Sequence, residues 1–79
     1  MDNLEPIKAR DTQVRFGHAV RARRRQLGLS QEALAAVANI HRTYIGSVER
    51  GERNVALNNI VALSKALQTT PSALLEGVE

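Results

Sequence analysis

The sequence contains no cysteine, which excludes disulfide bonds and zinc sites built on thiolates. Its two histidines, His18 and His41, lie too far apart to form a ligand pair on one helix face, and no acidic cluster surrounds either of them. We therefore expect neither a metal site nor a cofactor. The absence of cysteine also fits a reducing environment, so we expect a cytoplasmic location.

Long apolar runs and a secretory signal are also missing. No stretch approaches the ~20 apolar residues that a transmembrane helix needs. The N-terminal residues MDNLEPIK contain early acids in place of the apolar segment of a signal peptide. Cysteine nucleophiles, histidine dyads and glycine-rich phosphate loops are absent as well. The sequence thus favours a protein that neither spans a membrane nor catalyses a reaction.

With 79 residues, the chain is long enough for one domain with a small core. Domains of this size usually need a disulfide, a metal or a partner chain, and only the partner chain remains here, so we expect a homodimer. The basic residues are unevenly distributed, because residues 1–28 hold seven of the eleven against three acids. This local positive charge suits a surface that meets an anionic partner.

The pattern of apolar residues is helical, and no segment alternates apolar and polar residues as a half-buried strand does. We expect residues 1–10 to form a mobile arm and residues 11–79 to form a compact all-α domain of five short helices. The predicted helices span about residues 12–27, 31–38, 42–50, 57–67 and 71–75.

Polar residues that cap helices mark the start of several of these segments. Asp11 or Thr12 is expected to cap the first helix, and Ser30 the second. Thr70 is followed by Pro71, an arrangement typical of a cap and the first helical position. The helix boundaries thus rest on specific residues as well as on apolar spacing.

Residues 30–50 have the spacing of a helix-turn-helix unit. Two helices that cross steeply need a small residue at the contact, and Ala35 occupies that position. Four residues later, the tight turn needs a residue that tolerates positive φ, which Asn39 does. Ile45 and Val48 then fill the gap between the helices. An ordinary packing corner without nucleic acid is the alternative.

The segment QLGLSQEALAAVANIHRTYIGSVERGERN resembles the DNA-binding domain of the lambda/434 repressor and Cro type, also called the XRE family. Within it, HRTYIGSVERGERN is most similar to the controller proteins of restriction–modification systems. The resemblance covers residues 14–75. It implies a lambda-repressor-like fold of five helices, a homodimer, and binding to a palindromic operator to regulate transcription.

Three side chains of the helix predicted over 42–50 suit the reading of bases. Arg42 begins this helix, where its planar guanidinium can donate two hydrogen bonds to O6 and N7 of guanine. Thr43 can bond a base or touch a thymine methyl group, and Ser47 lies one turn later on the same face. The alternatives are a solvated Arg42 and a Ser47 hydroxyl bonded to the preceding turn.

Other polar residues are predicted to contact the sugar-phosphate backbone. Gln31 lies in the first turn of its helix, where free N–H groups favour a phosphate, and the family resemblance supports this contact. Ordinary solvent exposure is the alternative for most of this group, a core role is the alternative for Tyr44, and Arg53 could pair with Glu52 or Glu49. The predicted backbone contacts are Gln31, Tyr44, Arg50, Arg53 and Asn54.

Arg24 shares an apolar stripe with Val20 and Leu27, so it points toward the interior, where an unpaired charge is unfavourable. Glu49, at the end of the predicted 42–50 helix, is the expected partner, and the family resemblance supports the same buried pair. We expect this ion pair to fix the first helix to the helix that reads DNA.

The C-terminal half has more apolar residues than one small core needs. We expect some of them to form the seam of a homodimer, and the alternative is that all of them belong to the core. A dimer would place two reading helices about 34 Å apart, one turn of B-DNA. The dimer candidates are Leu57, Val61, Leu74, Leu75 and Val78.

The leading hypothesis is a sequence-specific transcriptional regulator that binds double-stranded DNA and controls a restriction–modification system. RNA polymerase is a further candidate partner. A small phage-type repressor shares the same residues and is an alternative. An antitoxin, or another protein-interaction module on the same fold, is the alternative from a different class.

Overall fold

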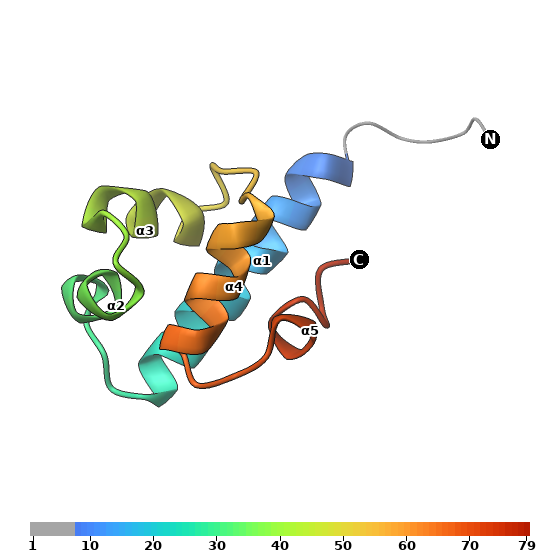
Figure 1. Cartoon of the computed structure of the whole chain (residues 1–79). Coiled ribbons are helices and arrows are strands. Elements are labelled where there is room, and N and C mark those ends of the chain that lie inside the picture. The colour runs from blue at the N-terminus through green and yellow to red at the C-terminus, as the bar shows by residue number, and fades with distance from the viewer. Residues whose placement is uncertain (1–7) are drawn as a thin grey trace.

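The computed structural model describes residues 8–79, and all regular structure in this range is helical (Figure 1). Helices α2 and α3 lie on one side of α1 and α4, and α5 lies on the other side of α4 (Figure 1). The all-α fold of five helices is therefore confirmed. The helices are α1 (Lys8–Gln26), α2 (Gln31–Ala38), α3 (Arg42–Glu49), α4 (Leu57–Ala66) and α5 (Pro71–Leu74).

Helix α1 begins earlier than predicted. It starts at Lys8, so Asp11 and Thr12 lie inside the helix and the prediction that one of them caps it is wrong. Lysine, alanine and arginine at positions 8–10 are all strong helix formers, which explains the added turn. The predicted mobile arm therefore loses these three residues to α1, and its residues 1–7 lie outside the described part of the chain.

Two of the predicted caps are confirmed. The Ser30 hydroxyl accepts a hydrogen bond from the backbone N–H of Ala33, with 3.0 Å between oxygen and nitrogen. The Thr70 hydroxyl does the same for Ala73 at 3.1 Å, and Pro71 occupies the first turn of α5. Each bond satisfies a backbone donor that the helix itself leaves unpaired.

The turn between α2 and α3 depends on a left-handed residue. Asn39 adopts φ 57° and ψ 47°, and its N–H donates to the carbonyls at the end of α2. This conformation lets α3 leave at a steep angle to α2. Ala35 is buried at the contact, and Ile45 and Val48 are buried between the two helices.

A single core joins all five helices. Helix α3 packs on α1 and α2, α2 packs on α4, and α5 packs on α4 and α1. Leu34, Leu63 and Leu67 are fully buried at its centre. The buried apolar residues are Phe16, Val20, Leu34, Ala35, Ile45, Val48, Leu63, Ala66, Leu67 and Leu74.

Two glycines allow α3 to approach α1 closely. A Cβ atom at Gly17 would lie only 2.3 Å from the carbonyl oxygen of Val48, so no larger residue fits at this crossing. Gly51 follows α3 with φ 78°, and a Cβ atom there would lie 2.7 Å from Cγ2 of Val14. The position of α3 on α1 thus depends on Gly51, which the sequence indicates as the end of this helix, and on Gly17, which the sequence pattern did not single out.

Arg23, one of the arginines near the end of α1, has a structural contact. Its Nε donates to the Leu67 carbonyl at 2.9 Å and a terminal nitrogen donates to the Gln68 carbonyl at 3.1 Å. These bonds satisfy carbonyls at the C-terminal end of α4, where positive charge is also favoured by the helix dipole.

Among residues 8–79, no helix is long and apolar enough to cross a membrane.

Candidate nucleic-acid interface

The N-terminal half of α3 presents two exposed polar side chains, Arg42 and Thr43. Within residues 8–79 no hydrogen bond or ion pair engages the Arg42 guanidinium, so its donors are available to an external acceptor. His41 is the N-cap of α3 and makes no side-chain cap bond, which leaves the first N–H groups of the helix without a side-chain partner. This end of α3 therefore carries several free donors on one surface.

Ser47 does not lie on that surface, and the prediction that it reads bases is wrong. Its side chain is buried, with 5% of the residue exposed. The hydroxyl donates to the Tyr44 carbonyl at 2.7 Å and accepts from Nε of Arg53 at 2.9 Å. The bond to the preceding turn is the alternative that the sequence left open. The physical reason for the burial is the loop after α3, which brings Arg53 against the helix.

Arg53 and Tyr44 form one unit beside α3. The guanidinium carbon of Arg53 lies 5.3 Å from the centre of the Tyr44 ring, a distance typical of a cation–π contact. Tyr44 is half-buried and also packs against the core. Within the described residues Arg53 pairs with neither Glu52 nor Glu49, and both it and Asn54 are exposed. The cation thus remains available on the surface.

Arg50 is engaged by an acid within its own loop. Its Nε and one terminal nitrogen donate to the two carboxylate oxygens of Glu52 at 3.0 and 3.2 Å. These hydrogen bonds hold the pKa of Glu52 below and the pKa of Arg50 above their ordinary values. The guanidinium also lies close to Gly46, where a Cβ atom would be 3.1 Å from a terminal nitrogen. A backbone contact by Arg50 would therefore compete with Glu52.

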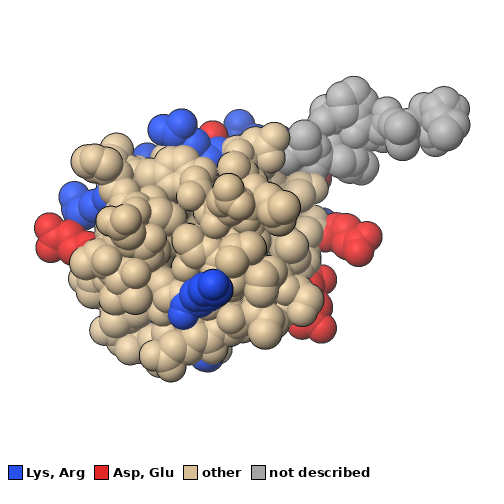
Figure 2. Space-filling view, in the orientation of Figure 1, with Lys and Arg blue, Asp and Glu red and all other residues tan. Residues whose placement is uncertain are grey.

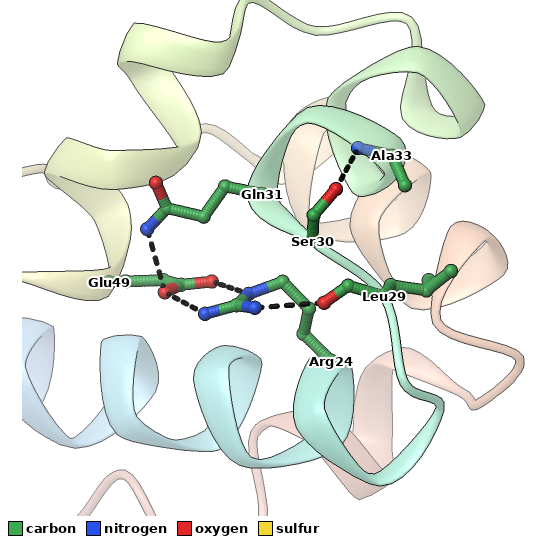
Figure 3. Close-up of polar contacts among 6 residues, drawn as sticks. All are labelled: Arg24, Leu29, Ser30, Gln31, Ala33 and Glu49. Carbon is green, nitrogen blue, oxygen red and sulfur yellow. Dashed lines mark hydrogen bonds and ion pairs between the residues drawn. The ribbon is translucent and has the colours of Figure 1, made fainter.

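Arg24 and Glu49 meet in a buried ion pair that links α1 to α3 (Figure 3). Two guanidinium nitrogens donate to the two carboxylate oxygens at 2.6 and 3.0 Å, and a third nitrogen donates to the Leu29 carbonyl at 2.9 Å. Gln31 completes the arrangement by donating to Glu49 at 3.1 Å. Gln31, which is predicted to contact a phosphate, thus also takes part in the hydrogen bonds that hold Glu49 of α3.

The charges of this pair stabilise each other. Burial alone would raise the pKa of Glu49, but the hydrogen bonds from Arg24 and Gln31 outweigh it, so the pKa lies below its ordinary value. The hydrogen bond to Glu49 likewise raises the pKa of Arg24. Both groups are therefore charged at neutral pH, and each satisfies the other inside the protein.

The predicted dimer residues have different surroundings. Leu74 is buried at 4% exposure and belongs to the core, so its assignment to a dimer seam is wrong. Leu75 and Val78 are half-buried and pack against the core. Leu57 is 71% exposed at the start of α4, and Val61, one turn later, is half-buried. The face that carries α4 and α5 is largely uncharged, with most charged side chains around its edge (Figure 2).

The chain belongs to the helix-turn-helix family, whose sequence model matches residues 20–74. Among its relatives are control proteins. The chain is 55% identical over 56 residues to the control protein C.SmaI from Serratia marcescens, covering 71% of this chain and 67% of that protein. It is 50% identical over 62 residues to the control protein C.BamHI from Bacillus amyloliquefaciens, covering 77% and 76% of the two chains.

Solved structures show the same fold. The restriction–modification controller protein C.AhdI from Aeromonas hydrophila superposes with a TM-score of 0.77 and 48% identity, covering 78% of this chain and 94% of that one. The P22 c2 repressor in complex with a synthetic operator superposes with a TM-score of 0.73 and 40% identity, with the same coverage. The lambda-repressor-like fold and the resemblance to controller proteins are thus confirmed.

Proposed function

We propose that this protein is a sequence-specific DNA-binding regulator that controls transcription within a restriction–modification system. The observation that carries the proposal is the similarity to two control proteins over most of the domain. An independent observation supports it: Arg42 is exposed and unpaired at the start of α3, and the Arg24–Glu49 ion pair links this helix to α1. A rigid helix with a free polar end is suited to a DNA groove.

In the mechanism that we propose, α3 enters the major groove. Arg42 donates two hydrogen bonds to one guanine, and Thr43 bonds a neighbouring base or touches a thymine methyl group. Arg53 and Asn54, in the loop after α3, meet the phosphates on one side, while Gln31 meets them at the start of α2. The phosphate contacts supply affinity that weakens with salt, and the base contacts supply specificity.

We further propose that the protein acts as a homodimer on a palindromic operator. Exposed Leu57 and half-buried Val61 lie one turn apart on α4, and the face that carries this helix is largely uncharged (Figure 2). Joining two copies through this face would bury apolar surface that one chain leaves in water. It would also present two α3 helices together, which a two-fold operator requires.

The sites that the protein selects from random double-stranded DNA test this function. We expect enrichment of one motif with two-fold symmetry and half-site centres about one helical turn, ~34 Å, apart. A protein that recovers no preferred sequence would contradict the proposal, and a motif without symmetry would contradict the dimer. Transcription from a promoter beside the selected site would then show whether RNA polymerase responds to the bound protein.

A further inference from the structure

The buried Ser47 hydroxyl takes part in two hydrogen bonds, in one as the donor and in the other as the acceptor. It donates its only proton to the Tyr44 carbonyl at 2.7 Å, within its own helix. With the proton fixed there, the oxygen lone pairs are free to accept, and Nε of Arg53 donates to them at 2.9 Å. Ser47 thus connects α3 to the loop that follows it, through a residue six positions away.

The hydrogen bond to Ser47 leaves the two terminal nitrogens of the Arg53 guanidinium free. Nε carries a single proton, which the bond to Ser47 consumes, whereas the two terminal nitrogens carry four more. Within residues 8–79 no acceptor engages these terminal nitrogens. The Tyr44 ring supports the guanidinium at 5.3 Å from the ring centre. Ser47 and Tyr44 therefore hold the guanidinium in place, while the N–H donors of its two terminal nitrogens remain available to an anion.

Arg50 provides a contrast within the same loop. Its Nε and one of its terminal nitrogens are both occupied by the Glu52 carboxylate. A phosphate approaching Arg50 must displace an acid or meet its negative charge, whereas a phosphate approaching Arg53 meets only unpaired donors. Of these two cations, Arg53 is the one whose free donors and fixed orientation fit a phosphate.

We propose that Ser47 is a positioning residue, which holds Arg53 over Tyr44 so that the guanidinium is already ordered when it meets a DNA phosphate. This inference rests on the function proposed above. We expect Ser47 itself to make no contact with DNA, since it is buried. An ordered arginine binds more tightly because the entropy of fixing its long side chain has been lost during folding instead of during binding.

The decisive comparison uses the parent, Ser47→Ala, Arg53→Ala and the double variant, each binding the selected operator in a fluorescence anisotropy titration. Ordering of one long side chain is worth roughly two- to tenfold in affinity, and Ser47→Ala should lose this amount in the parent. In the Arg53→Ala background, the same substitution should change nothing. Equal losses in both backgrounds, or no loss in the parent, would overturn the positioning role.

Salt dependence and rescue separate positioning from a structural role. Arg53→Ala should reduce the slope of log affinity against log salt by about one, because a phosphate contact is lost. Ser47→Ala should leave the slope near that of the parent, because the charge remains. Ser47→Thr, which retains a hydroxyl, should recover most of the affinity. A slope reduced equally by Ser47→Ala, or no recovery with threonine, would contradict the inference.

A measurement without DNA makes the inference independent of operator binding. The Arg53 Nε–H signal should show a rigid side chain on the ps–ns timescale in the parent protein and a mobile one in Ser47→Ala. Equal mobility in the two proteins would overturn the inference. A parent with a rigid Arg53 that binds no DNA would instead overturn the proposed function, and with it the purpose assigned to Ser47.

Discussion

Removal of the Glu49 carboxylate should destabilise the protein more than removal of any exposed charge. Glu49→Ala deletes two hydrogen bonds from Arg24 and one from Gln31, and it leaves the Arg24 guanidinium with the Leu29 carbonyl alone. Arg24 is only 9% exposed, so its charge would stay buried without a counter-ion. Breaking such a pair from one side reduces the free energy of unfolding by ~3–5 kcal/mol.

The loss is large for a domain of this size. Small domains have a free energy of unfolding of about 5–15 kcal/mol in total, so the substitution removes a substantial share. At about 4–8 °C per kcal/mol for a domain of this length, the melting temperature should fall by more than ~10 °C. Circular dichroism during thermal and urea unfolding measures both quantities, and all variants are compared at one protein concentration because the proposed dimer would make stability depend on concentration.

Glu52→Ala is the matched control. It removes another carboxylate that accepts hydrogen bonds from two arginine nitrogens, but the two side chains of this pair are at least half exposed. Water solvates the freed Arg50, so we expect the melting temperature to change little. A Glu49→Ala variant whose melting temperature falls no further than that of Glu52→Ala would show that Arg24 is not left buried without a counter-ion.

The same pair predicts how stability depends on pH. The pKa of Glu49 is lowered in the folded state, so its contribution is fully present above the pKa of an unfolded glutamate, about 4.3. It is lost as the pH falls through the lower folded value, because the unfolded chain binds the proton first. Below about pH 4.3 the parent should therefore lose stability more steeply than Glu49→Gln, as measured by urea unfolding across this range.

Three further predictions concern α1, α2 and the loop after α3. Gly17→Ala places a Cβ atom 2.3 Å from the Val48 carbonyl and should reduce the free energy of unfolding by ~1–3 kcal/mol. An unchanged urea midpoint would contradict the close approach of α1 and α3. Ser30→Ala removes the cap of α2 and should reduce it by ~0.5–2 kcal/mol, whereas Ser30→Asp should retain most of the stability. Glu52→Gln removes an acid that engages Arg50 and should strengthen DNA binding in an anisotropy titration at low salt. Weaker binding would show that the Glu52 carboxylate helps the interface.

The helix-turn-helix corner could be predicted because its requirements are local. A small residue at Ala35, a left-handed residue at Asn39 and a cap at Ser30 are each set by the backbone within a few positions. The Arg24–Glu49 pair could be proposed because a charge on an apolar stripe needs a partner. The position of Glu49 at the end of the predicted 42–50 helix indicated which one, and the family resemblance supported it.

The features that could not be predicted depend on contacts between distant segments. Helical spacing places Ser47 and Thr43 one turn apart on the same face, but the loop that follows α3 folds Arg53 over Ser47 and buries it. The role of Gly17 becomes visible only when the backbones of α1 and α3 meet. An apolar Leu74 suits both a core and a dimer seam, and only the packing of α5 decides that it belongs to the core.

We propose that α3 reads DNA sequence through its exposed N-terminal end. The most direct test compares the sequence preferences of the parent and Arg42→Ala at every position of the selected operator. We expect the variant to lose ~1–3 kcal/mol of discrimination at one base pair of each half-site and to keep its preferences elsewhere. Unchanged preferences at all positions, or an equal loss on every sequence, would contradict base reading by Arg42.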